Sequence, residues 1–269
     1  MIIKILSLES IKNYCINFLE KHPIGYLLGA QIVKLILSLP HEIDYYGFRV
    51  LQERGLAGKK VILDIGGNQG HSSRGFLKIL KDYEVISFEA LALHQKSLHK
   101  IKLRFKEKFT YYINAVGNDS TQCIEFFMPY YYGFSLHSAA ATELENVNII
   151  YEMWPKLKNN NSIIIRKYTS NMIRIDDLNL NFNMMKIDIQ GGEYEALLGM
   201  EKSIAINQPI ILIETQIGVN NIDQLLKQYG YAPYIYNPSS REFYSGASHI
   251  GRNTFYIPLC HMSLVNKNE

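Results

Sequence analysis

From Lys60 onward, short runs of β-branched and aliphatic residues alternate with longer segments in which apolar residues recur every three or four positions. This alternation is typical of a parallel sheet whose strands are joined by crossover helices. The apolar runs predict seven strands, at Val61–Ile65, Glu84–Phe88, Thr110–Asn114, Met184–Ile189, Pro209–Glu214, Tyr231–Tyr236 and Thr254–Pro258. The helical segments are Ser72–Lys81, Ala90–Arg104, Glu193–Ala205 and Asn221–Tyr229.

Two segments depart from this rhythm. Between Tyr236 and Thr254 there is no helical pattern, so we expect the last strand to enter antiparallel, as in a hairpin. The segment Thr121–Leu180 is aromatic, then rich in asparagine, then alternating, which predicts an insertion with extra strands and a loop. We therefore divide the chain into an N-terminal helical extension (1–58), an α/β domain (59–260, with an insertion around 121–180) and a C-terminal tail (261–269).

Apolar residues dominate Ile24–Leu39, which lies between two prolines and is predicted to be a helix. The segment is shorter than the roughly 20 residues that a membrane span needs. Gln31, Lys34 and Ser38 form one narrow polar stripe on it. The pattern favours a helix packed on the rest of the domain or on a second subunit, with peripheral contact to a membrane surface as the alternative.

Composition restricts the function classes. Of 269 residues, 47% are hydrophobic and 20% charged, which is typical of a folded globular protein. The net charge is only +3 and the lysines are scattered, so a nucleic-acid partner is not indicated. The three cysteines have no paired spacing, and the N-terminus lacks the features of a secretory signal. We expect a cytoplasmic protein.

The segment Val61–Gly70, with the sequence VILDIGGNQG, joins the first strand to the first helix. It lacks the lysine of a P-loop and the G-x-G-x-x-G spacing of a dinucleotide site, and Asp64 adds a negative charge where a pyrophosphate would sit. That charge suits a cationic or zwitterionic ligand, such as the amino-acid end of S-adenosylmethionine (SAM). Gly66 and Gly70 would let the backbone approach the ligand closely. A purely structural turn would explain the glycines, but it gives no reason for Asp64 and Asn68.

Three further positions follow predicted strands. Glu89 ends the second strand, close to the roughly 20-residue offset expected for an acid that binds ribose hydroxyls. The third strand leads into Ala115, where the adenine edge would lie. The fourth strand supplies Asp188 at its carboxyl end, followed by two glycines, Glu193 and an amphipathic helix.

Taken together, the motifs LDIGGNQG, ISFEA, NAVGN, RIDDL, KIDIQGGEYEALLG and NTFYIP resemble the FkbM family of SAM-dependent methyltransferases, from Val61 to Pro258. The resemblance implies a seven-stranded, Rossmann-like methyltransferase fold with a mostly parallel sheet. It also implies O-methylation, often of sugar units in surface polysaccharides or secondary metabolites. The implied cofactor contacts are Asp64, Gly66, Asn68 and Gly70 to the methionine part and Glu89 to the ribose, while Asp188 and Glu193 fall on the fourth-strand motif.

One position departs from the family pattern, which commonly has glutamate where this chain has Gln190. An amide cannot take a proton from a substrate hydroxyl. We therefore assign the candidate base to Asp188, Glu193 or one of two loop histidines, His137 and His249.

Asp188 and Glu214 end consecutive central strands. Related small-molecule O-methyltransferases place a divalent metal at such strand ends, where carboxylates, water and substrate hydroxyls suit Mg²⁺. The metal would lower the pKa of the hydroxyl. In the alternative interpretation, both carboxylates bind substrate or backbone amides directly.

The residues therefore predict a SAM-dependent O-methyltransferase whose acceptor is a small molecule or a glycan. Tyrosines 130 to 132 and the pair Arg252 and Asn253 are candidates for holding a sugar. Two other classes remain open: a nicotinamide-dependent oxidoreductase, and a SAM-binding scaffolding subunit that has lost its chemistry. The N-terminal helix could also support a homo-oligomer.

Overall fold

The computed structural model describes residues 43–131, 134–135, 141–142, 144, 147, 163–214, 219–246 and 253–265. The chain forms two compact units. The smaller comprises residues 1–40 and 125–168, and the larger comprises residues 41–124 and 169–269. The main sheet lies in the larger unit.

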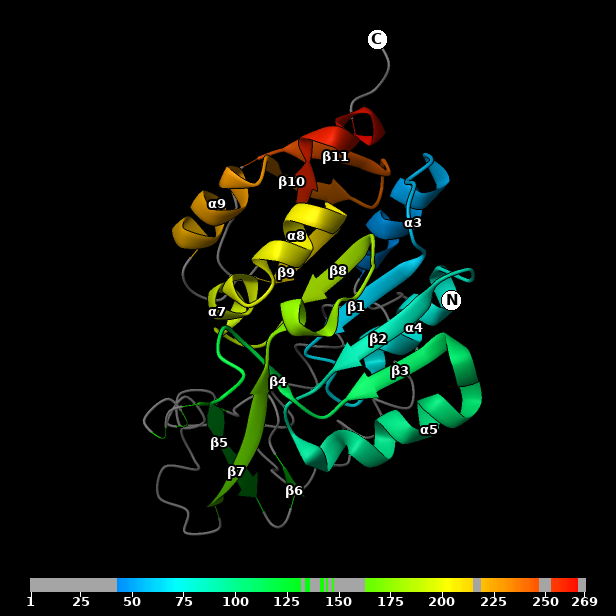
Figure 1. The fold of residues 1–269 in the computed structure, drawn as a ribbon. Coiled ribbons are helices and arrows are strands. Elements are labelled where there is room, and N and C mark those ends of the chain that lie inside the picture. The colour runs from blue at the N-terminus through cyan, green and yellow to red at the C-terminus, as the bar shows by residue number, and fades with distance from the viewer. Residues whose placement is uncertain are drawn as a thin grey trace, which may run out of the picture. The chain divides into compact units, whose positions relative to one another are not determined.

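The main sheet has eight strands in the order β11-β10-β12-β9-β8-β1-β2-β3 (Figure 1). Their bounds are β1 Val61–Ile65, β2 Glu84–Phe88, β3 Phe109–Tyr112, β8 Met184–Ile187, β9 Ile210–Glu214, β10 Tyr231–Asn237, β11 Glu242–Ser245 and β12 Asn253–Pro258. The five strands from β9 to β3 in this order pair in parallel. β12 is antiparallel to both β9 and β10, which confirms the predicted antiparallel last strand.

All seven predicted strands are present, but the predicted count of seven is wrong because β11 adds an eighth. β11 has four residues, pairs only with β10, and buries only Phe243. Such a short, polar edge strand carries too little alternation to be predicted from its sequence.

Helices cover both faces of this sheet. On one face, α3 (Tyr46–Glu53), α4 (His71–Ile79) and α5 (Gln95–Phe105) contribute Phe48, Phe76 and Leu98 to one core cluster. On the other face, α7 (Glu193–Leu198), α8 (Glu201–Asn207) and α9 (Val219–Gln228) build the second cluster. Successive residues of β1 join alternate clusters, so this strand is buried on both sides.

The predicted helix Glu193–Ala205 is two helices, α7 and α8. The break falls at Gly199, where an added Cβ would lie 1.8 Å from the carbonyl oxygen of Gly117. Short 3-10 helices complete the larger unit: η1 Ile43–Tyr45, η2 Ala92–His94, η3 Lys106–Lys108, η7 Ile175–Leu178 and η8 Leu259–Leu264.

The predicted insertion contains extra strands: β5 (Cys123–Tyr131), β6 (Phe134–Ser135) and β7 (Ile163–Ile173), which form a second sheet with β4 (Ala115–Val116) in the order β4-β7-β5-β6. The predicted N-terminal helix Ile24–Leu39 lies outside the described residues. Within the described part of the chain, no helix is long and apolar enough to cross a membrane.

Candidate cofactor site

The turn after β1 has a backbone that larger residues could not adopt. Gly66 has φ +85°, and a Cβ there would lie 1.9 Å from the carbonyl oxygen of Asp188. Gly70 has φ +81°, and its Cβ would lie 2.1 Å from Ile101 Cδ1 on α5. The amides of Gly66 and Gly67 both donate to the carbonyl of Phe88, at 2.9 and 3.0 Å. The turn is therefore packed tightly against the ends of β2 and β8 and against α5.

Asp64 is fully buried behind this turn. Its Oδ2 accepts hydrogen bonds from the hydroxyls of Ser72 (2.7 Å) and Ser73 (2.5 Å) in the first turn of α4. Its Oδ1 has no hydrogen-bond partner among the described residues. Asp64 therefore fixes the start of α4 relative to β1 and keeps one carboxylate oxygen free of hydrogen bonds.

Lys186 on β8 is a residue of the candidate site that the sequence did not indicate. It pairs in register with Asp64, and its side chain is only 5% exposed. Its Nζ donates to the carbonyl of Gly66 at 3.2 Å and lies 3.3 Å from Asp188 Oδ2 and 3.6 Å from Asp64 Oδ1. Burial alone would lower the pKa of Lys186, but the two carboxylates outweigh it and raise the pKa, so the side chain is a buried ammonium. The available sequence signal is a single lysine within the apolar run of β8.

Glu89, just past β2, is buried beside the same turn. Its Oε2 accepts from the amide of Asn68 at 2.7 Å, and its Oε1 accepts from the amide of Leu91 at 2.8 Å. Asn68 has φ +48°, a conformation that is uncommon outside glycine. Burial raises the pKa of Glu89, although these two amides oppose the shift. Each carboxylate oxygen keeps a second lone pair with which it can accept from a ligand hydroxyl.

Asp188 and Glu193 differ sharply in exposure. The Asp188 side chain is 25% exposed, and its Oδ1 accepts from Gln190 Nε2 at 2.9 Å. Glu193 is fully buried, and its Oε1 accepts from the amides of Ile189 and Gly191 at 3.2 and 3.1 Å. Glu193 thus holds the loop that follows Asp188, and its role as a base stays a prediction.

Glu214 ends β9, and Ile187 on β8 pairs with Ile213 on β9. Asp188 and Glu214 therefore follow neighbouring positions at one edge of the sheet. Among the described residues, no group of three or more His, Cys, Asp or Glu side chains is placed to hold a metal ion. A metal held by these two carboxylates stays a prediction.

The remaining predicted site residues are divided between described and undescribed parts of the chain. Ala115 is buried in β4, beyond the end of β3, and its amide donates to Ser170 Oγ at 3.0 Å. His137 and His249 lie outside the described residues, as does Arg252.

The chain is similar to known methyltransferases. The model of the methyltransferase FkbM domain matches residues 64–233. Among solved structures, the methyltransferase FkbM from Methylobacillus flagellatus KT is 14% identical with a TM-score of 0.44, over 92% of this chain and 59% of that one. A TehB-like SAM-dependent methyltransferase from Corynebacterium glutamicum is 13% identical with a TM-score of 0.40, over 88% of this chain and 100% of that one. The SAH-bound methyltransferase PaMTH1 from Podospora anserina is 10% identical with a TM-score of 0.39, over 96% and 97% of the two chains.

This chain thus spans 59% of the length of the first of these structures. No curated protein matches the sequence. The family model covers more than half of the chain, and its match includes the glycine turn, Glu89 and the segment from Lys186 to Glu193. The chain therefore belongs to the FkbM methyltransferase family.

Proposed function

We propose that the protein is a SAM-dependent O-methyltransferase that acts on the hydroxyl of a sugar unit. The observation that carries the cofactor assignment is the charge around the glycine turn. Asp64 in β1 and Asp188 just past β8 both lie within 4 Å of the buried ammonium of Lys186, and Glu89, just past the neighbouring strand β2, adds a third carboxylate. This excess of negative charge favours a cationic ligand. SAM has a net charge of about +1, from a sulfonium and an ammonium against one carboxylate. S-adenosylhomocysteine (SAH) lacks the sulfonium charge and is therefore neutral overall.

The three carboxylates take different roles in this proposal. Glu89 accepts from the ribose hydroxyls, because its two oxygens are held in place by backbone amides and keep free lone pairs. Asp64 has no exposed surface, so it acts through its charge and by fixing the turn with Ser72 and Ser73. Asp188 is the only one of the three with substantial exposed surface, which makes it the candidate to touch the ammonium or the acceptor.

When bound, SAM supplies an electrophilic methyl group. The contribution of this chain is mainly positioning: the glycine turn and Glu89 fix the cofactor, so that an acceptor hydroxyl can approach the methyl in line. A carboxylate at Asp188 can accept the proton that the hydroxyl loses. Gln190 and Lys186 orient that carboxylate, since one contacts each of its oxygens.

The sugar acceptor follows from what the family resemblance implies. The smaller unit, taken by itself, contains an aromatic group of a kind that can bind a sugar. The hydroxyl of Tyr130 lies 2.5 Å from that of Tyr168, and the guanidinium of Arg166 lies 4.6 Å from the centre of the Tyr130 ring. Burial and the contact with Tyr168 raise the pKa of Tyr130 to about 12, so it stays protonated at neutral pH. A tyrosine held in this way can pack on the C–H face of a sugar.

Calorimetric titration with SAM and SAH tests the cofactor, and transfer of a labelled methyl group to a panel of sugars tests the reaction. We expect SAM to bind, and Glu89→Gln, which keeps one side-chain oxygen that can accept from a backbone amide, to weaken that binding. If the parent protein binds neither SAM nor SAH, the proposal is wrong. Binding of NAD(H) instead would indicate an oxidoreductase, and SAH binding without transfer to any acceptor would indicate a scaffolding subunit.

A further inference from the structure

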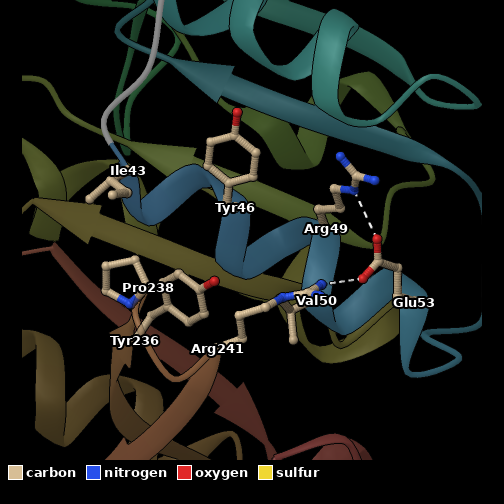
Figure 2. A pocket seen from close by; sticks show the side chains of 8 residues that line it. All are labelled: Ile43, Tyr46, Arg49, Val50, Glu53, Tyr236, Pro238 and Arg241. Carbon is tan, nitrogen blue, oxygen red and sulfur yellow. Dashed lines mark hydrogen bonds and ion pairs between the residues drawn. The ribbon is translucent and has the colours of Figure 1, made fainter.

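A pocket of about 380 Å³ lies between α3 and the hairpin that joins β10 to β11 (Figure 2). This volume falls in the range of roughly 300–1,000 Å³ that is usual for small-molecule sites. The lining residues come from η1 and α3 (Ile43, Tyr46, Arg49, Val50 and Glu53) and from the hairpin (Tyr236, Pro238 and Arg241). None of them takes part in the cofactor site described above.

One part of the pocket is cationic. Arg49 Nε lies 2.8 Å from Glu53 Oε1, and Arg241 pairs with the other oxygen of the same carboxylate. Two guanidinium groups thus share one counter-charge, and Figure 2 shows both converging on Glu53. Arg49 makes this contact through Nε, which leaves its two terminal nitrogens available to a ligand. Guanidinium groups with free N–H pairs bind phosphate and carboxylate in a bidentate manner.

The other part of the pocket is apolar and aromatic. Figure 2 shows Ile43, Pro238 and Tyr236 gathered on one side, with Tyr46 above them. Ile43 is 58% exposed and Tyr46 is 38% exposed, whereas Tyr236 is buried. Aromatic rings and aliphatic groups pack well on the C–H face of a sugar ring. A ligand with a sugar ring and a negative charge would therefore match both parts.

The backbone conformation of Arg241 is unusual for a residue with a side chain. Arg241 has φ +57°, a left-handed conformation that strains a residue with a Cβ. Arg54 holds this conformation by donating to the carbonyl of Arg241 at 3.0 Å. Glycine would adopt the same turn without strain, but only a residue with a cationic side chain supplies the second guanidinium of the pocket.

The pocket starts at the edge of the sheet that carries the cofactor site. Asn253 Nδ2 donates to Asp44 Oδ2 at 3.0 Å, which ties the turn before α3 to β12, and Asn253 pairs with Glu214 at the end of β9. The strand order places β10 three strand spacings from β8. At about 4.8 Å per spacing, the hairpin lies roughly 14 Å from the end of β8, which carries Asp188. A single sugar ring does not span that distance.

We propose that this pocket binds an anionic sugar unit, one that bears a phosphate or a carboxylate, in an acceptor that extends to the methylated hydroxyl. The proposal rests on the proposed function for the methylated end of the acceptor. It adds that the acceptor is longer than one sugar and carries negative charge away from the reaction centre.

Saturation-transfer NMR on the full chain, with glucose 1-phosphate, glucuronate and glucose as probes, tests the proposal. We expect at least one anionic probe to bind about tenfold or more tightly than glucose, because charge-assisted hydrogen bonds are among the strong ones. The double variant Arg49→Gln/Arg241→Gln should lose this preference, and Glu53→Gln should strengthen anion binding because it frees both guanidinium groups. Arg104→Gln, an exposed arginine on α5, is the matched control and should behave like the parent.

Equal binding of glucose and of both anionic probes would overturn the proposal, as would unchanged binding by the double variant. Competition by inorganic phosphate as strong as that by glucose 1-phosphate would overturn recognition of the sugar. The tighter of the two anionic probes distinguishes phosphate from carboxylate. Titration of the same samples with SAM and SAH separates the two proposals. Failure of the sugar probes to bind a parent protein that binds SAM or SAH refutes the pocket alone, whereas a parent protein that binds neither SAM nor SAH refutes the proposed function.

Discussion

Replacing Lys186 with methionine tests how the cofactor site is held together. Its Nζ lies 3.6 Å from Asp64 Oδ1 and 3.3 Å from Asp188 Oδ2. At an effective dielectric constant of about 20, a unit-charge pair at 3.6 Å is worth about 4 to 5 kcal/mol. The pair with Asp188 is weaker, since that side chain is partly exposed and screened by solvent. Methionine fills a similar volume but leaves Asp64 buried without its counter-charge, so we expect the free energy of unfolding to fall by about 3 to 5 kcal/mol.

Urea unfolding followed by far-UV circular dichroism at pH 7 measures this loss. Lys100→Met on the exposed face of α5 is the control, and the double variant Lys186→Met/Asp64→Asn should recover part of the stability because it removes the unpaired charge. The pKa of Lys186 is raised above its ordinary 10.5, so its stabilisation is fully present below pH 10.5 and is lost only as the pH rises through the raised pKa. The parent should therefore show no loss from this group at neutral pH. Stability of Lys186→Met within about 0.5 kcal/mol of the parent would refute this account.

Three further predictions concern the ligands of the site. Glu89→Gln should weaken SAM binding about tenfold or more. Because burial raises the pKa of Glu89 above 4.5, SAM affinity in the parent should fall as the pH falls through that raised pKa, and calorimetry at several pH values should find a flatter dependence in the variant. Gly66→Ala should abolish SAM binding and destabilise the fold, because the added Cβ would collide with the carbonyl oxygen of Asp188. Gly55→Ala is the control: Gly55 has φ +96° but nothing within 4 Å of an added Cβ, so this variant should only strain the backbone. Thermal unfolding and SAM titration compare the two variants. If Asp188 and Glu214 hold Mg²⁺, EDTA should lower methyl transfer at least about tenfold and added Mg²⁺ should restore it, and full activity in EDTA would exclude the metal.

The central strands could be predicted from the sequence because their pattern is unambiguous. β1 and β2 occur with the predicted bounds, since apolar runs between turn residues are typical of buried parallel strands. The break between α7 and α8 could not be predicted in this way. It falls at Gly199, whose close approach to Gly117 depends on a contact more than eighty positions away, and apolar periodicity contains no information about such contacts.

The site shows the same division between local and long-range information. Asp64, Glu89 and Asp188 are predicted as site residues because a carboxylate stands out at the end of an apolar strand, and the structure places all three on adjacent strands of the sheet. Lys186 could not, because a single lysine in a strand is typical of an exposed position in an alternating pattern. Its partner Asp64 lies more than a hundred positions earlier, and only the pairing of β8 with β1 brings the two together.

Burial then separates acids that the sequence could not tell apart. Asp64 and Asp188 are both carboxylates at strand ends, and both contact Lys186. Asp64 has no exposed surface and its Oδ2 is held by two serines, so no ligand can contact it unless the turn moves. Asp188 is 25% exposed, so of these two carboxylates it is the one that can accept a proton or a ligand hydrogen bond directly. A loss of activity on replacing Asp64 would therefore report on the shape and charge of the site, whereas a loss on replacing Asp188 with stability intact would report on contact with the reacting groups.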